Sequence, residues 1–194
     1  MPGKIIALTG PSGVGKDYTK KVLKKRFPRF LELTVLTTRK RRPSDGKDRK
    51  TNISQSLFLK MKTDKEIIAA HQPFGVKGDW YGFSKKEVDK LFNNNKIILT
   101  EVHPDNIITF KKLYKDKISI IALIAEKEYL ENNLKLRESE KKYNLIVRIT
   151  TARKEIAKIK KLNKKSLIDS VIELNRENRN NLSEIIIKEV KRLL

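Results

Sequence analysis

A glycine-rich turn near the start of the chain constrains the fold more than any other segment. It follows a continuous apolar run at 4–9, and the residues from Gly15 to about Phe27 predict a helix that Pro28 ends. Backbone N–H groups of such a turn converge on phosphate oxygens, the helix N-terminus adds partial positive charge, and a following lysine supplies a mobile cation. The alternative is a turn without a ligand. The turn and its lysine fit G-x-x-x-x-G-K in the order Gly10-Pro11-Ser12-Gly13-Val14-Gly15-Lys16.

The order of the remaining segments predicts the fold class. Strand-like and helix-like segments alternate, and with right-handed crossovers this builds an α/β fold of three layers around a central parallel sheet. Ligands of such a fold lie at the carboxyl ends of the strands. The apolar runs that predict strands lie at 31–36, 97–102, 118–124 and 170–174, and the helical patterns lie near 84–93, 105–114, 126–136 and 176–193.

Two regions break the alternation. Residues 40–83 contain Pro43, Asp45-Gly46 and further prolines and glycines, with strand-like pieces at 51–59 and 74–77, and they predict a small inserted subdomain. Residues 137–162 predict a long amphipathic helix reached by a polar turn. Its apolar positions at helical spacing are Leu145, Ile149, Ala152, Ile156 and Ile159.

Size and composition exclude several classes of protein. At about 100–200 residues per domain, 194 residues allow one domain with a small lid. Without cysteine there is no disulfide, thiolate nucleophile or thiolate metal site. No segment approaches the roughly 18 apolar residues of a membrane span, and the first ten residues are too short for a signal peptide, so we expect a cytoplasmic protein.

The positive charge favours a phosphorylated ligand over nucleic acid. The formal net charge is +22, which attracts polyanions. The basic residues are spread along the chain, and no zinc-finger spacing, RNA-binding aromatic motif or basic region with heptads accompanies them. We therefore interpret most of them as solvated helix faces.

The residue after the phosphate-loop lysine departs from the usual pattern. Ser or Thr normally stands there and holds Mg²⁺, whereas this chain has Asp17, followed by Tyr18. A carboxylate is also a hard oxygen ligand for Mg²⁺. Without the metal, Asp17 would face the triphosphate with like charge, so the sequence predicts a steep dependence of nucleotide binding on Mg²⁺. Thr19 cannot substitute simply for a hydroxyl at position 17, because residues two apart on a helix point about 200° away from each other.

Four motifs, in order along nearly the whole chain, resemble the guanylate kinase family. The opening GPSGVGK is similar to the phosphate loop of that family, and Thr37-Thr38-Arg39 with Arg42 resembles its TTRxxR signature. The segment from Gly78 to Ser84 resembles its G-x-x-YG segment, and Arg137 and Arg148 match its lid arginines.

The resemblance implies a phosphate-loop core, a lid and a small domain that binds a nucleoside monophosphate. It implies a core of 1–36, 84–125 and 160–194, a monophosphate-binding insert of 37–83 and a lid of 126–159. Arg39, Arg42 and Tyr81 would hold the acceptor phosphate, which suits the bidentate grip of arginine on phosphate. Arg137 and Arg148 would close over the transferring group. The ATP-binding residues would be Gly10 to Lys16, Asp17, Tyr18 and Asn175.

Several positions differ from the family pattern. The GE-x-x-G-x-DY segment is shortened to 44–49, and Arg49 stands at the position of a phosphate-binding tyrosine. Gln72 aligns with an acidic residue, Phe83 with a hydroxyl residue, and Glu101 and His103 with a pair of aspartates. The N1–H and N2 amino donors of guanine require a carboxylate acceptor, and neither Gln72 nor His103 is one.

Four further positions have two interpretations each. Glu101 ends a predicted strand at the ligand edge, where its carboxylate could hold Mg²⁺ or orient the acceptor; a solvated strand end is the alternative. His103 suits a structural role before Pro104 or a contact with the base. Trp80 suits the core of the small domain better than a stacking platform. Asn175 resembles an adenine contact, and a turn role is equally compatible.

The expected activity is transfer of the γ-phosphoryl group of ATP, with Mg²⁺, to a nucleoside monophosphate, with GMP or dGMP first. Two alternatives stay open. Lys16-Asp17 also resembles ribose bisphosphate kinases of phosphonate metabolism, which act on a sugar phosphate. A catalytically idle kinase fold that binds nucleic acid or a protein is the other. We expect no membrane or nucleic-acid partner, and a monomer or homodimer.

Overall fold

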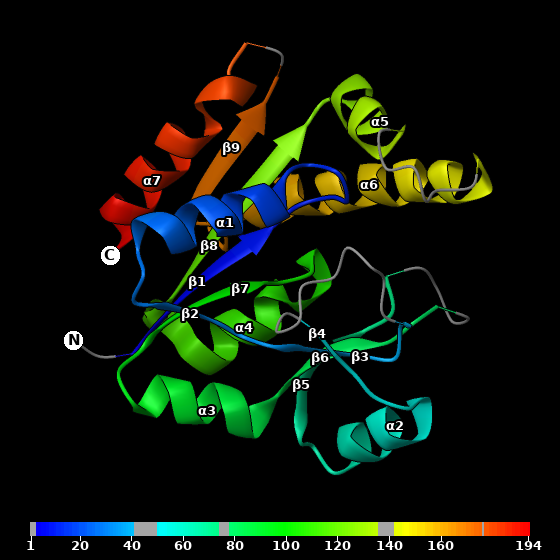
Figure 1. Ribbon diagram of the computed structural model, residues 1–194, viewed down its shortest axis with the longest axis vertical. Helices are drawn as coiled ribbons and strands as arrows, with labels where there is room; N and C mark the ends of the chain where they lie inside the picture. Colours follow the sequence, from blue (N-terminus) through cyan, green and yellow to red (C-terminus); the bar gives the residue numbers. More distant parts are fainter. Residues whose placement is uncertain (1–2, 41–49, 74–77, 136–141, 176) are drawn as a thin grey trace.

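A five-stranded parallel sheet forms the centre of the protein (Figure 1). The computed structural model describes residues 3–40, 50–73, 78–135, 142–175 and 177–194. The strands are in the order β2-β7-β1-β8-β9, and each neighbouring pair is parallel. Their bounds are β1 Lys4–Thr9, β2 Phe30–Glu32, β7 Ile97–Glu101, β8 Ile118–Ala125 and β9 Ser170–Leu174.

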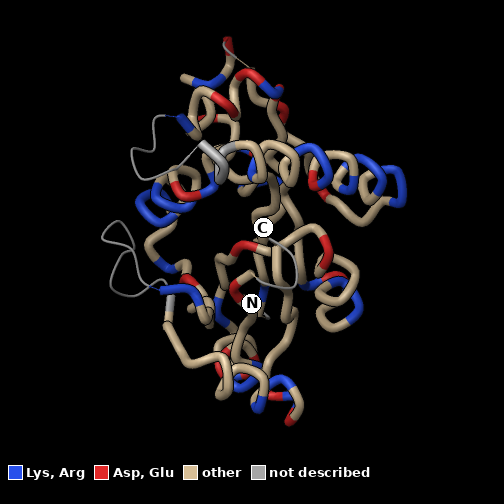
Figure 2. The backbone as a smooth tube through the Cα atoms, turned by 90° about the vertical axis from the view of Figure 1, so that its right-hand side faces the viewer, with Lys and Arg blue, Asp and Glu red and all other residues tan. Residues whose placement is uncertain are grey.

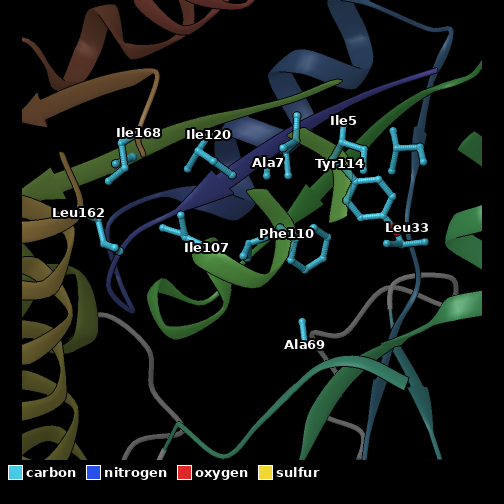
Figure 3. Packing of buried hydrophobic residues seen from close by; sticks show 14 of the residues in the cluster. Ile5, Ala7, Leu33, Ala69, Ile107, Phe110, Tyr114, Ile120, Leu162 and Ile168 are labelled. Carbon is cyan, nitrogen blue, oxygen red and sulfur yellow. The ribbon is translucent and has the colours of Figure 1, made fainter. Parts of the chain in front are cut away.

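Helices cover both faces of this sheet. On one face, α1 (Lys16–Arg26) and α7 (Leu182–Leu193) pack Leu23 and Ile186 against Leu8 and Leu123. On the other face, α3 and α4 bury side chains such as Phe110 against the strands (Figure 3). The expected three-layer α/β fold with a central parallel sheet is confirmed. The helices on the second face are α3 Lys85–Asn93 and α4 Ile107–Tyr114.

A second, smaller sheet lies beside the first. Its order is β4-β3-β6-β5, and β6 is antiparallel to both of its neighbours. The helix α2 (Gln55–Thr63) packs Phe58 against Leu36 and Ile67 in a separate small core. Trp80 stacks on Phe58 with ring centroids 5.6 Å apart, so it belongs to this core, as the sequence indicated. The strands are β3 Val35–Thr37, β4 Lys50–Asn52, β5 Ile67–His71 and β6 Tyr81–Ser84.

The structure corrects two expected strands. The apolar run at 31–36 is not one strand, because β2 pairs with β7 in the central sheet while β3 belongs to the small sheet. The piece at 51–59 is a strand only at its start. The hydroxyl of Ser54 accepts a hydrogen bond from the backbone N–H of Leu57 and begins α2 there. The piece at 74–77 lies outside the described residues, and β5 and β6 were not expected as strands.

The remaining helical elements include the longest helix that the structure describes, α6. They are α5 (Lys127–Lys135) and α6 (Lys142–Asn163), with short 3₁₀ turns η1 (Pro104–Asn106), η2 (Lys115–Lys117) and η3 (Arg179–Asn181). Helix α6 buries Ala152 and Ile159, which were among its expected apolar positions. Helix α7 begins at Leu182, later than the pattern from 176 indicated, because η3 precedes it. Within the described ranges, none of the helices has both the length and the apolar character of a membrane span.

Candidate functional site

The glycine-rich turn joins β1 to α1 at the carboxyl edge of the central sheet. Gly10, Gly13 and Gly15 have φ angles of 144°, 86° and 106°, which side chains with a Cβ rarely adopt. A Cβ on Gly10 would collide with the backbone carbonyl of Leu123 in β8. The turn therefore needs glycine both for its shape and for its close approach to β8. The side chain of Val14 is completely buried in the core and so holds the turn against the sheet.

The lysine that follows the turn folds over it. Lys16 Nζ donates to the backbone oxygen of Gly10 at 2.6 Å and to that of Pro11 at 2.9 Å. The ammonium group is thereby held at the glycine-rich turn, next to the first backbone N–H groups of α1. This is an arrangement of donors suited to an anionic ligand.

Helices α5 and α6 bring side chains to the same turn. Arg148 of α6 is 9% exposed, and its Nη1 donates to the hydroxyl of Ser12 at 2.9 Å. Asn133 of α5 donates from Nδ2 to the backbone oxygen of Gly13 at 2.9 Å. The structure thus places Arg148 beside the turn, whereas Arg137 lies outside the described residues. Asn133 was not identified from the sequence, because an Asn within a helical pattern carries no signal of its contacts.

A buried lysine lies at the centre of three carboxylates beneath the turn. Lys20 Nζ is 2.6 Å from Glu101, 2.9 Å from Glu32 and 3.7 Å from Asp17, and its side chain is 8% exposed. Burial opposes the charged ammonium, but Glu101 and then Glu32 outweigh it and hold the pKa of Lys20 above its ordinary value. The cluster ties α1 to the ends of β2 and β7. The sequence assigned most basic residues to solvated helix faces, and the buried Lys20 is an exception.

The carboxylates near the turn suit a magnesium ion that arrives with a nucleotide. Asp17 lies in the first turn of α1 with its side chain 62% exposed, whereas the carboxylate of Glu101 is bonded to Lys20. Among the described residues no group of three His, Asp or Glu side chains could hold a metal by itself. Mg²⁺ bound with phosphates needs only one or two carboxylates, because phosphate oxygens and waters complete its shell. The roles of Asp17 and Glu101 as ligands remain predictions.

The two segments that carry the expected acceptor residues hold each other in place. The hydroxyl of Thr37 donates to the backbone oxygen of Trp80 at 2.9 Å, and the backbone N–H of Trp80 donates to the hydroxyl of Thr38 at 2.9 Å. Arg39 follows β3, and its backbone N–H donates to Thr37 Oγ1 at 3.1 Å. Arg39 and Tyr81 are therefore carried by adjoining strands. Arg42 and Arg49 lie outside the described residues.

Three rings lead from Tyr81 towards α6. Tyr81 stacks on His71 with centroids 5.7 Å apart, and His71 stacks on His103 at 4.6 Å. The Nδ1 atom of His71 is 3.1 Å from both the backbone oxygen of Ala69 and the Nδ2 atom of Asn106. Burial, together with the nearby imidazole of His103, lowers the pKa of His71 to about 4. His71 is thus an uncharged part of this stack at neutral pH.

A cavity of about 520 Å³ lies between the end of β5, the start of η1 and α6. Gln72 and His103, both expected on the acceptor side, line it. The Nε2 atom of Gln72 donates to the backbone oxygen of Gly78 at 2.7 Å. His103 begins η1 by accepting the backbone N–H of Asp105, and its Nε2 is 3.1 Å from Glu155 Oε1. The remaining side of the cavity is formed by α6 residues including Val147, Thr150, Thr151, Lys154 and Glu155.

Two expected nucleotide-binding residues lie at the surface. Tyr18 is 50% exposed on α1. Asn175 follows β9, and its Oδ1 accepts the backbone N–H groups of Glu177 and Asn178, which is the turn role that the sequence allowed. Their contacts with ATP stay predictions.

Comparison with known proteins identifies the family. A family model described as "Guanylate kinase" matches residues 2–188. The chain belongs to the guanylate kinase family. A guanylate kinase of Mycoplasma mobile is 33% identical over a match that covers 99% of this chain and 92% of the relative. One of Nostoc sp. is 27% identical, with 80% of this chain and 77% of the relative covered.

A solved structure supports the fold of this guanylate kinase family member. The guanylate kinase of Anaplasma phagocytophilum superposes with a TM-score of 0.71 and covers 98% of this chain and 86% of its own. The sequence identity of the pair is 19%, so this likeness concerns the fold alone. The resemblance seen in the sequence motifs is confirmed by the family match.

Removing the buried ammonium group should destabilise the fold. We expect Lys20→Met to lower the free energy of unfolding by about 3–5 kcal/mol, because Glu32 and Glu101 would lose their buried cation. Lys24→Met is the matched control, since Lys24 also faces Glu32 but is 47% exposed, and it should cost less than about 1 kcal/mol. Urea unfolding at pH 7 measures both, and equal losses would contradict the central role of Lys20.

The pKa of His71 predicts a pH dependence of stability. The unfolded chain binds a proton at His71 below its ordinary value of 6.5, whereas the folded protein does so only below about 4. Because the unfolded state holds more protons in this window, the free energy of unfolding falls as the pH drops from 6.5 to 4. His71→Phe keeps a ring but cannot titrate, so the free energy of unfolding of this variant should fall less over the same pH range. Urea unfolding at half-unit pH steps tests this, and parallel curves for the two proteins would contradict it.

Proposed function

We propose that this protein is an ATP-dependent nucleoside monophosphate kinase that transfers the γ-phosphoryl group of ATP to GMP or dGMP. The products are ADP and the nucleoside diphosphate. The observation that carries the proposal is the convergence of Lys16 and the buried Arg148 on one glycine-rich turn in a member of the guanylate kinase family. Cations placed on a turn of this shape are suited to a triphosphate.

The reaction requires two anions to meet. An oxygen of the acceptor phosphate forms a bond to the γ-phosphorus, and the bond from that phosphorus to the β,γ-bridging oxygen breaks. The acceptor phosphate is already a nucleophile, so no protein base is needed. The proposed task of the protein is to position both phosphates and to neutralise their charge. We assign Lys16 to the β- and γ-oxygens and Arg148, with Arg137, to the transferring group.

The acceptor phosphate would be held on the small sheet. Tyr81 begins β6, Arg39 follows the adjoining β3 by two residues, and the hydrogen bonds among Thr37, Thr38 and Trp80 hold the two segments together. By the family resemblance, Arg42 and Arg49 would add further positive charge. This assigns core residues 1–36, 84–125 and 160–194, a monophosphate-binding insert at 37–83 and a lid at 126–159. A cytoplasmic location is part of the same proposal.

Mg²⁺ would be held through Asp17, and when bound it would neutralise oxygens of the β- and γ-phosphates. The exposed carboxylate of Asp17 lies one residue after Lys16, which is the position of the usual hydroxyl ligand. Glu101 would act through the Lys20 cluster or in the outer shell of the ion.

A sugar-phosphate acceptor is the second candidate. Two observations favour it. Asp17 follows Lys16, and position 72 holds an amide, bonded to Gly78, where a carboxylate would be needed to accept hydrogen bonds from guanine. The idle binding protein has less support, because Lys and Arg are spread over many helices and loops rather than gathered in one segment (Figure 2).

Activity against a panel of acceptors tests the function. We expect ADP release with GMP and dGMP that exceeds release with AMP, UMP, CMP and ribose 1,5-bisphosphate. Lys16→Met should lower kcat by about 10²–10³, because it removes a cation from the transition state. Lys25→Met, an exposed change on the same helix, is the control and should have the parental rate. Turnover of ribose 1,5-bisphosphate without turnover of any guanine nucleotide would show that the acceptor is the sugar phosphate and not GMP.

The metal requirement is tested by binding rather than turnover. Calorimetric titration of ATP should give an affinity at least about tenfold weaker without Mg²⁺, because Asp17 would then repel the triphosphate. Asp17→Asn removes that charge and should reduce the difference between the ATP affinities measured with and without Mg²⁺. Equal affinities of the parental protein with and without Mg²⁺ would be inconsistent with a role for Asp17 in holding the ion.

A further inference from the structure

We propose that Glu155 of α6 reads the guanine edge of the acceptor nucleotide and so determines base specificity. The inference rests on the proposed function and names the residue that selects its substrate. It starts from a gap in the sequence: Gln72 and His103, which align with acidic positions of the family, cannot accept hydrogen bonds as a carboxylate does. The structure places His103 in contact with a carboxylate from a different element, Glu155, and Gln72 lines the same cavity as that carboxylate.

Glu155 is positioned within the cavity as a binding group would be. It lines the cavity of about 520 Å³ together with Gln72, and its side chain is only 12% exposed. Asp105 also lines the cavity, but its side chain is 52% exposed and paired with Lys158. Of these two carboxylates, Glu155 is therefore the one shielded from solvent, where a hydrogen bond discriminates best.

The neighbouring imidazole orients the carboxylate of Glu155. The Nδ1 atom of His103 accepts the backbone N–H of Asp105 at 3.3 Å. In a neutral imidazole the proton then resides on Nε2, which lies 3.1 Å from Glu155 Oε1 and donates to it. His103 is thus a positioning residue: it acts on the base through Glu155.

A stack of three rings links the proposed phosphate site to the cavity. Tyr81, assigned to the acceptor phosphate, is separated from His103 by two ring spacings of 5.7 and 4.6 Å through His71. This is comparable with the reach from the phosphate of a nucleotide to the far edge of its base. A nucleotide held at Tyr81 and Arg39 can therefore place its base in the cavity beside Glu155.

The chemistry of the carboxylate selects among purines. Guanine presents N1–H and the N2 amino group as adjacent donors, and a carboxylate accepts both. Hypoxanthine keeps N1–H but lacks the amino group, and adenine presents an unprotonated N1 that the carboxylate repels. The site should therefore bind GMP better than IMP and IMP better than AMP.

Equilibrium binding of the three nucleotides tests the assignment. By calorimetry, the parental protein should bind GMP about tenfold more tightly than IMP, since one charge-assisted hydrogen bond separates them. Glu155→Gln should weaken GMP binding by about tenfold or more and bring the GMP-to-IMP ratio close to one. Glu155→Asp, which keeps the charge on a shorter side chain, should give an intermediate ratio. Glu131→Gln removes an equal charge from α5 outside the cavity and should leave the ratio unchanged.

Several outcomes would overturn the inference. A GMP-to-IMP ratio retained in Glu155→Gln would do so, as would a ratio that changes with Asp105→Asn instead. If Glu155→Gln does not fold, judged by thermal melting and by ATP affinity, the parental protein decides: equal binding of GMP and IMP excludes a carboxylate that contacts the amino group. A parental protein that binds ATP but neither binds nor phosphorylates GMP would instead refute the proposed function.

Discussion

The close approach of the glycine-rich turn to β8 is the constraint on which the rest of the structure depends. Gly10 passes so near the backbone of Leu123 that no side chain fits, and this fixes where β1 ends and α1 begins. The position of α1 in turn sets Lys16 over the turn and Lys20 beneath it. Through Lys20 the ends of β2 and β7 are tied to α1 by buried ion pairs, so the carboxyl edge of the sheet has a fixed shape.

Helix α6 connects the two halves of the proposed reaction. Arg148 and Glu155 are seven residues apart, which places them on one face of the helix two turns from each other. Arg148 contacts the turn at Ser12, and Glu155 contacts His103 beside the cavity proposed for the acceptor. A shift of α6 would therefore move Arg148 of the proposed donor site and Glu155 of the proposed acceptor site together. This gives a physical basis for coupling the binding of ATP to the binding of the acceptor.

Patterns of short range were the most predictable part of the protein. The turn between 10 and 16, its flanking strand and helix, and the strands at 97, 118 and 170 follow from local spacing, and the structure has them within a few residues. The division of 31–36 between two sheets was not predictable, because apolar residues stand on both sides of Thr34 and the two strands are distinguished by their pairing partners. The strand-like piece expected at 51–59 is mostly helix α2, in which Phe58 is buried while Leu57 and Leu59 are exposed.

The sequence by itself determined the glycine-rich turn, the α/β class and the family, because each depends on residues that are neighbours along the chain or spaced by a regular period. The tertiary structure alone decided which distant charges meet. Lys20 with Glu101 and Arg148 with Ser12 are separated by 81 and 136 positions, and no local pattern links them. Whether a charged side chain lies in solvent or in a buried site depends on which distant segments pack against it, and only the tertiary structure determines that packing.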